Sequence, residues 1–190
     1  MARILVFAGS TREGAFSKQL ARAGAIALDG LSGPQTSNLI DLADFEAPVY
    51  NADLEAAKGL PEPIRSFKIL ARQHDGMMIA TPEYNGCVPP LLVNLFSWAS
   101  RPEGDEGPSV FHDRPVALMA SSPGGLGGVR VVPRLRDMVS ELGMIPASGF
   151  VSVPHAHSAF AADGKLADPA QQNGVTGLAE RLLAQIPPPA

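Results

Sequence analysis

Short apolar runs of strand length alternate along this chain with longer segments of helical periodicity, and this alternation limits the possible folds more than any other feature. Five runs are predicted to form strands, at residues 4–8, 37–41, 76–80, 116–120 and 148–153. Five helices are predicted between and after them, at residues 16–28, 61–74, 89–99, 128–142 and 168–186. Strands separated by helices pair in parallel, because a parallel crossover needs a long connection. The pattern therefore predicts an α/β fold with a three-layer, doubly wound, five-stranded parallel sheet.

Length, charge and cysteine content narrow the possibilities further. The 190 residues suit a single domain over residues 1–190, with an irregular excursion at 43–59. The net charge of −4 argues against nucleic acid as the main ligand. One cysteine, Cys87, excludes an internal disulfide and two-cysteine metal motifs, and no metal site is predicted. No segment has the apolar length of a membrane span, and the first apolar run is too short for a signal peptide. We therefore expect a cytoplasmic protein without membrane contact.

Loops after three of the predicted strands carry the candidate site, because ligands of doubly wound sheets bind at the carboxyl ends of strands. The first loop, residues 9–18, combines glycines for a tight turn with polar side chains at Ser10, Thr11, Arg12 and Ser17. With the N-terminus of the following helix they predict an anion cradle. The loop lacks the lysine and hydroxyl of a Walker P-loop, so it suits a monophosphate better than a nucleoside triphosphate. The alternative is an ordinary turn with a capping serine.

The second loop, residues 81–90, is rich in proline and glycine. Pro82 fixes the backbone and removes a donor, and Gly86 permits a positive φ. Tyr84 and Asn85 add a flat surface and an amide. A rigid loop with free backbone donors and acceptors suits a planar heterocycle such as an isoalloxazine ring. The alternative is a proline-rich turn into a helix.

The third loop, residues 121–130, contains four glycines within five residues. They permit a flat ligand or another backbone to approach closely. It is not a dinucleotide-binding fingerprint, because it follows the fourth strand and its glycine spacing is wrong. The alternative is a floppy surface loop.

Together these loops resemble those of the NADPH-dependent FMN reductase family, which includes bacterial quinone, chromate and azo-compound reductases. The resemblance covers nearly the whole chain. It rests on Gly-Ser-x-Arg at 9–12, Pro-Glu-Tyr-Asn-Gly at 82–86, the 89–101 segment with Asn94, Trp98, Ser100 and Arg101, and Ser-Pro-Gly-Gly-x-Gly-Gly-x-Arg at 122–130. The resemblance implies a flavodoxin-like sheet in the order 2-1-3-4-5 and assembly into a homodimer or homotetramer.

The resemblance also implies where FMN binds. Contacts with the phosphate are implied for Ser10, Arg12, Ser17 and Lys18. Contacts along the isoalloxazine ring are implied for Pro82, Glu83, Tyr84, Asn85 and Gly86, and the far side of the ring is implied to be closed by Ser122, Gly124 and Gly125. The family's common Gly-Ser-Phe-Asn is here Gly14-Ala15-Phe16-Ser17, which removes a possible phosphate contact and predicts weaker FMN binding.

The activity that the resemblance implies is that of an FMN-dependent NAD(P)H oxidoreductase. Two electrons would pass by a ping-pong route from NADPH or NADH to a small acceptor such as a quinone, a flavin, an azo compound or a metal oxyanion. The cofactor supplies this chemistry, so no side chain is predicted to act as a catalytic residue. The alternatives are a flavodoxin-type electron carrier and a flavin-free sensor or assembly subunit.

Three further features have two interpretations each. The predicted helix 89–99 is apolar on more than one side, which favours a subunit interface over burial beneath the 43–59 excursion. Cys87 is expected to be a small buried filler rather than a redox thiol. A set of arginines either attracts the phosphates of the nicotinamide nucleotide or pairs with surface carboxylates: Arg101, Arg114, Arg130, Arg134 and Arg136.

Overall fold

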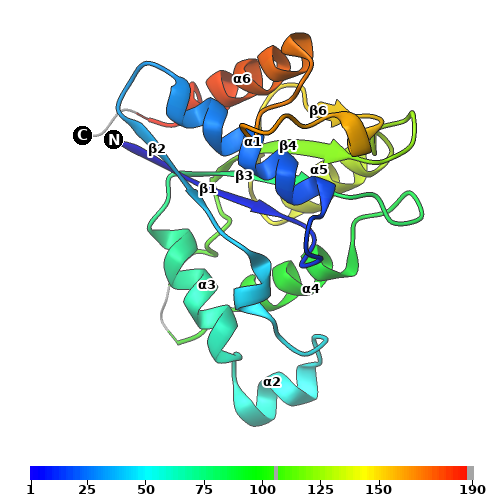
Figure 1. Ribbon diagram of the computed structural model, residues 1–190. Helices are drawn as coiled ribbons and strands as arrows, with labels where there is room; N and C mark the ends of the chain where they lie inside the picture. The colour runs from blue at the N-terminus through cyan, green and yellow to red at the C-terminus, as the bar shows by residue number, and fades with distance from the viewer. Residues whose placement is uncertain (105–106, 188–190) are drawn as a thin grey trace.

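A parallel sheet runs through the middle of the computed structural model, which describes residues 1–104 and 107–187 (Figure 1). Its strands are β1 (Ala2–Ala8), β2 (Gln35–Leu39), β3 (Gly76–Thr81), β4 (Pro115–Ser121), β5 (Ile145–Pro146) and β6 (Val151–Val153). The α-helices are α1 (Phe16–Gly30), α2 (Ala52–Lys58), α3 (Glu62–Arg72), α4 (Pro90–Ala99), α5 (Val131–Glu141) and α6 (Pro169–Leu183). Two 3₁₀ turns, η1 (Leu42–Phe45) and η2 (Ala156–Ser158), complete the described elements.

The strand order is β2-β1-β3-β4-β5, and every pairing is parallel. This confirms the flavodoxin-like, doubly wound order predicted from the sequence. The fifth strand predicted at 148–153 is present as β6, at Val151–Val153, but the prediction missed a sixth short strand, β5, which also pairs with β4. The chain leaves the sheet between them, where Gly149 adopts a φ of 79° that a regular strand does not allow.

The excursion at 43–59 was expected to be irregular, yet it contains η1 and α2. The Asn51 side chain accepts hydrogen bonds from the backbone N–H groups of Asp53 and Leu54 at the start of α2. Gly59 ends the helix with a φ of 70°. The N-cap asparagine and the glycine after the last turn are ordinary helix signals, and the sequence contains both. The prediction nevertheless missed this helix, because its seven residues are too few to show a clear apolar period.

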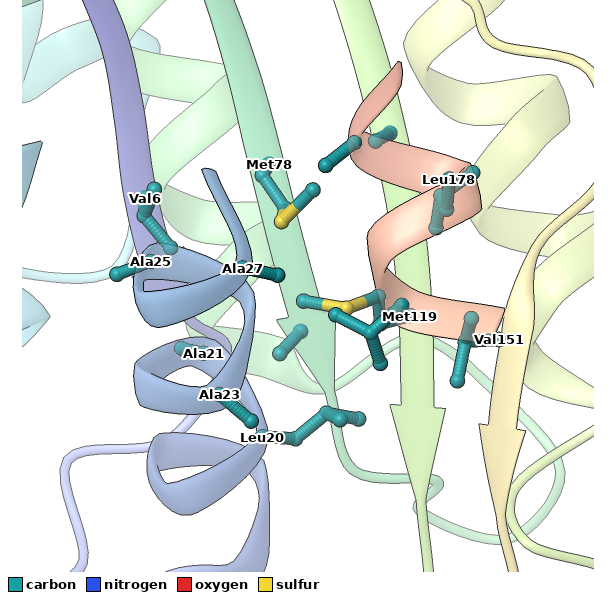
Figure 2. Packing of buried hydrophobic residues seen from close by; sticks show 14 of the residues in the cluster. Val6, Leu20, Ala21, Ala23, Ala25, Ala27, Met78, Met119, Val151 and Leu178 are labelled. Atoms are coloured by element: carbon teal, nitrogen blue, oxygen red, sulfur yellow. The ribbon is translucent and has the colours of Figure 1, made fainter. Parts of the chain in front are cut away.

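Two apolar layers cover the sheet. Figure 2 shows α1 and α6 packed on one face, where Leu20 and Leu178 meet Met119 of β4. A Cβ atom at Gly24 would lie 2.6 Å from the sulfur of Met78, so glycine allows α1 to approach this closely. Helices α3, α4 and α5 cover the other face, around a set of fully buried large side chains that includes Phe7, Phe67, Trp98 and Phe111.

The excursion lies against α4. The Asn94 side chain accepts a hydrogen bond from the Tyr50 N–H (2.8 Å) and donates to the carbonyl of Pro48 (3.1 Å). The indole N–H of Trp98 also donates to the Pro48 carbonyl, at 2.8 Å. Burial beneath the excursion therefore accounts for Trp98, which the sequence had offered as part of a subunit interface. Val93 remains exposed on this helix.

Side chains occupy both edges of the sheet. Beside β5 and β6, Arg136 of α5 donates to the carbonyls of Ala147 and Gly149, and Arg181 of α6 donates to the carbonyl of Ser148. At the opposite edge, the Asp29 carboxylate accepts from the Ser37 N–H of β2 at 2.8 Å. Side chains thus bond some of the backbone groups along each edge of the sheet.

Candidate functional site

Three loops from different strands meet at the carboxyl edge of the sheet and enclose an open cleft of about 200 Å³. Other cavities of about 180 to 380 Å³ lie elsewhere among the described residues, and none of these joins all three loops that the sequence singled out. Its lining residues are Ser10, Arg12, Ala15, Phe16, Ser17, Pro82, Glu83, Tyr84, Ser121, Ser122 and Pro123.

The N-terminus of α1 opens onto this cleft without a cap of its own. Ala15 stands at the N-cap position and offers no side-chain acceptor, and the first turn contains no acidic residue. The first N–H groups of a helix have no partner within it, and the helix dipole favours an anion beside them. The Ser10 hydroxyl accepts from the Arg12 N–H at 3.3 Å, which closes the turn ahead of the helix.

Two buried hydroxyls in the cleft wall have no hydrogen-bond partner in the protein, Ser17 Oγ in the first turn of α1 and Ser121 Oγ at the end of β4. A buried hydroxyl without a partner costs about 1–3 kcal/mol. A bound ligand with several oxygen atoms would remove this cost. The residues present therefore fit the phosphate and ribityl chain of FMN.

The two cations of the first loop have different surroundings. Arg12 is exposed, lies 5.8 Å from the centre of the Phe16 ring, and donates only to the carbonyl of Glu13. Lys18 instead donates to Asp41 Oδ2 at 2.5 Å and to the Thr11 carbonyl at 3.0 Å. Burial would raise the pKa of Asp41, but hydrogen bonds from Lys18 and the Ala43 N–H outweigh it and lower this pKa. Arg12 is thus the cation available to the cleft, and Lys18 ties the loop to the end of β2.

The second loop is a hairpin with a two-residue turn. The N–H of Cys87 donates to the carbonyl of Tyr84, and the N–H of Tyr84 donates back to Cys87. Asn85 and Gly86 between them have φ values of 53° and 77°. Two positive φ values are typical of a type I′ turn, for which Asn-Gly is the preferred pair. The sequence contained this signal, although it was interpreted only as a rigid loop.

The hairpin is joined to the third loop through Glu83. Its carboxylate accepts from the Arg130 backbone N–H at 3.1 Å and from Arg130 Nε at 2.7 Å, and Arg130 Nη2 makes a further ion pair with it. One turn later, Arg134 donates to the carbonyl of Gly86. Neither contact was predicted, because 47 and 48 residues separate the partners in the chain.

The glycine-rich loop is held on its other side by β6 and the residues after it. The N–H of His155 donates to the carbonyl of Gly124, and the N–H of Ala156 donates to the carbonyl of Ser122. The Ser152 hydroxyl donates to the carbonyl of Gly127 at 2.9 Å. These bonds contradict the alternative of a floppy surface loop.

The structure brings together seven of the residues named from the sequence, which line the cleft: Ser10, Arg12, Ser17, Pro82, Glu83, Tyr84 and Ser122. Others lie in the same loops but not in its lining: Thr11, Lys18, Asn85, Gly86, Gly124 and Gly125. The sequence missed Ser121, whose burial without a partner no local pattern reveals. The expectation of a buried Cys87 was wrong, because the thiol is exposed where the hairpin returns to α4.

Three of the five arginines serve structural contacts away from the cleft. Arg101 pairs with Glu55, Arg114 donates to the carbonyl of His74, and Arg136 binds the edge of the sheet. Burial lowers the pKa of Arg114.

Within residues 1–104 and 107–187, no group of three His, Cys, Asp or Glu side chains is placed to hold a metal ion. None of the described helices is long and apolar enough to cross a membrane.

Comparison with known proteins agrees with this geometry. The model of the NADPH-dependent FMN reductase family matches residues 2–158. An NAD(P)H-dependent FMN reductase of Pseudomonas aeruginosa is 34% identical over 169 residues, which cover 87% of this chain and 85% of that protein. A quinone reductase of Escherichia coli is 31% identical over 137 residues, 72% of this chain and 69% of that protein.

A solved structure extends the likeness to the fold. FerB, a flavoenzyme NAD(P)H:acceptor oxidoreductase from Paracoccus denitrificans, superposes with a TM-score of 0.81 and 25% identity, covering 98% of this chain and 100% of FerB. Three loops at one rim, an uncapped helix N-terminus and a match over most of the sequence lead to one conclusion: this chain belongs to the NADPH-dependent FMN reductase family.

Proposed function

We propose that this protein is an FMN-dependent oxidoreductase that takes two electrons from NADPH or NADH and passes them to a small acceptor such as a quinone. The observation that carries this proposal is the cleft in which an uncapped helix N-terminus and two unpartnered hydroxyls face an Asn-Gly hairpin. An anion site at one end and a flat, donor-bearing edge at the other suit a phosphorylated flavin.

The bound flavin would supply the redox chemistry, and the chain would bind and orient it. The α1 N-terminus, with Ser10, Thr11, Arg12 and Ser17, would hold the phosphate. The hairpin would present the backbone N–H groups of Asn85 and Gly86 to the edge of the ring, where donors stabilise developing negative charge. The third loop would close the other side with Ser122, Gly124 and Gly125. Lys18 would act on the phosphate only through the loop that it holds.

The reaction order belongs to the same proposal. One open cleft joins the three loops, so NAD(P)H and the acceptor would occupy it in turn, which is a ping-pong scheme. A flavodoxin-type carrier is less favoured, because the rim carries Arg12, Arg130 and Arg134 rather than an acidic docking face. A cytoplasmic location and a homodimer or homotetramer formed through the 89–99 region complete the proposal.

The absorbance spectrum of the purified protein tests this function. We expect flavin bands, bleaching on anaerobic addition of NADPH, and recovery on addition of menadione. Initial rates with both substrates varied should give parallel double-reciprocal lines. Colour without bleaching by NADPH or NADH would instead indicate a carrier, and a colourless protein that refuses micromolar FMN would indicate the flavin-free alternative.

A further inference from the structure

The contacts between the second and third loops depend on one carboxylate and two arginines. Glu83 accepts three hydrogen bonds from Arg130, one from its backbone and two from its guanidinium. Arg134, on the same face of α5, donates to the carbonyls of Gly86 and Arg130. Among the described residues, the other hydrogen bonds of the hairpin are its two cross-strand bonds between Tyr84 and Cys87. The arginines therefore supply the side-chain bonds that join the hairpin to the N-terminal end of α5.

The two partners of the ion pair differ in exposure. The Glu83 side chain is 6% exposed and the Arg130 side chain is 60% exposed. Loss of Arg130 would leave a nearly buried carboxylate without its counterion, whereas loss of the Glu83 charge would leave an arginine in water. Removing one partner of a buried pair costs most when the remaining charge is the buried one. Loss of Arg130 should therefore be more damaging than loss of the Glu83 charge.

We propose that Glu83, Arg130 and Arg134 form a latch that holds the Asn85–Gly86 turn in position for the cofactor ring, and that Arg130 is its principal positioning residue. This inference rests on the proposed function. In the latch, Glu83 is an internal anchor rather than a proton donor. Arg130 contributes geometry and charge compensation and takes no part in proton transfer.

Affinity for FMN gives the first test. Apo protein is titrated with FMN by fluorescence quenching for the wild type, Glu83→Gln, Arg130→Met, Arg130→Lys and the double variant Glu83→Gln/Arg130→Met. We expect Arg130→Met to weaken binding about 10-fold or more, because the hairpin would then hold its binding position only part of the time and the apparent affinity falls by that fraction. Glu83→Gln should have a smaller effect, and the double variant should bind better than Arg130→Met alone. Arg130→Lys should recover part of the lost FMN affinity, because lysine restores the positive charge but not the bidentate guanidinium donors.

Hydrogen exchange of the hairpin amides offers a second measurement that needs no cofactor. The N–H groups of Tyr84 and Cys87 are hydrogen-bonded to each other's carbonyls across the hairpin. Their exchange rates in apo protein report how often the hairpin opens. We expect faster exchange in Arg130→Met than in wild type, with Glu83→Gln between them. Arg136→Met is the matched control, because this arginine also leaves α5 to bind carbonyls but lies at the sheet edge.

The outcomes separate the latch from the proposed function. If wild-type protein binds no FMN, the proposed function fails, while the amide exchange rates of the hairpin still test the latch. If Arg130→Met matches wild type in both measurements, or if the double variant is worse than Arg130→Met, the latch is rejected. If Arg136→Met accelerates amide exchange at Tyr84 and Cys87 as much as Arg130→Met does, the effect is general loosening of the fold and the latch is also rejected.

Discussion

At the scale of single residues, the site is marked by polar groups that the protein leaves without partners. Ser17 Oγ and Ser121 Oγ are buried in the cleft wall and have no hydrogen-bond partner, whereas the Ser152 hydroxyl donates to the carbonyl of Gly127. The sequence indicated Ser17 through its place at the start of a helix. It could not indicate Ser121, because burial and the absence of a partner arise only when β4, α1 and the loops are brought together.

Ser121→Ala should therefore have opposite effects on folding and on binding. Removal of an unpartnered buried hydroxyl should raise the free energy of unfolding of apo protein by about 1 kcal/mol. FMN affinity should fall by about 3- to 10-fold, the value of one neutral hydrogen bond. Chemical denaturation and FMN titration measure the two quantities. Ser152→Ala is the control and should lose stability, because its hydroxyl is bonded. A destabilised Ser121→Ala with unchanged affinity would contradict the assignment.

Arg12→Ala should act on binding alone. The Arg12 side chain is exposed and donates only to the carbonyl of Glu13, so apo stability should stay within about 0.5 kcal/mol of wild type. FMN affinity should fall about 10-fold or more through loss of a charged phosphate contact. Single-turnover bleaching by NADPH at saturating FMN should change much less. Equal FMN affinity in the two proteins would remove Arg12 from the phosphate site.

At the scale of elements, the sequence was most informative where the pattern was long and regular. Helices α1, α3, α4 and α6 and strands β1, β3 and β4 were predicted within a few residues, because apolar periodicity determined them. The short α2 and the divided edge of the sheet escaped prediction, since seven- and two-residue elements carry almost no period. The latch escaped because pairing between Glu83 and Arg130 is a product of tertiary structure.

Gly86→Ala tests the hairpin. A Cβ at Gly86 has room, with its nearest neighbour at 3.8 Å, so the cost comes from the backbone φ of 77°. A left-handed conformation costs an alanine about 1–2 kcal/mol, and the turn should relax away from type I′. We expect lower stability and weaker FMN binding. Gly30→Ala, at a helix end with open space and no positive φ, should be neutral in both assays. Unchanged affinity in Gly86→Ala would show that the turn geometry is not needed.

The Lys18–Asp41 pair predicts a specific acid response. The pKa of Asp41 is lowered in the folded state below its usual 3.8, so the pair adds stability above that value and loses it as the pH falls through the folded pKa. Asp41→Asn should lose less than about 1 kcal/mol at pH 7, because the carboxylate is partly exposed. The difference from wild type should shrink as the pH falls below 3.8 and through the lowered folded pKa. Urea unfolding at several pH values measures it, and a difference that grows on acidification would contradict this sign.

At the scale of the whole molecule, two exposed valines mark the surface through which two copies of the chain are proposed to associate. Val49 and Val93 are 83% and 40% exposed, and both adjoin Asn94, which binds the 47–50 segment to α4. These two exposed valines support the proposed interface around 89–99, although the 47–50 segment itself covers Trp98.

Val93→Glu should break this interface. Wild type is expected to show at least twice the 19.9 kDa monomer mass by light scattering, and the variant is expected to shift toward the monomer. Arg101 is unsuited as a probe, because it supports the excursion through Glu55. A monomeric wild type would reject the assembly, and an unchanged oligomer in Val93→Glu would place it on another surface.

Side chains that are hydrogen-bonded along the two edges of the sheet affect which surface a second copy can use. Guanidinium groups from α5 and α6 already satisfy the carbonyls outside β5 and β6, and a carboxylate already satisfies an outward amide of β2. A second copy that continued the sheet at these positions would have to displace these side chains. Strand addition is disfavoured there, which favours contact between copies through the helical layers.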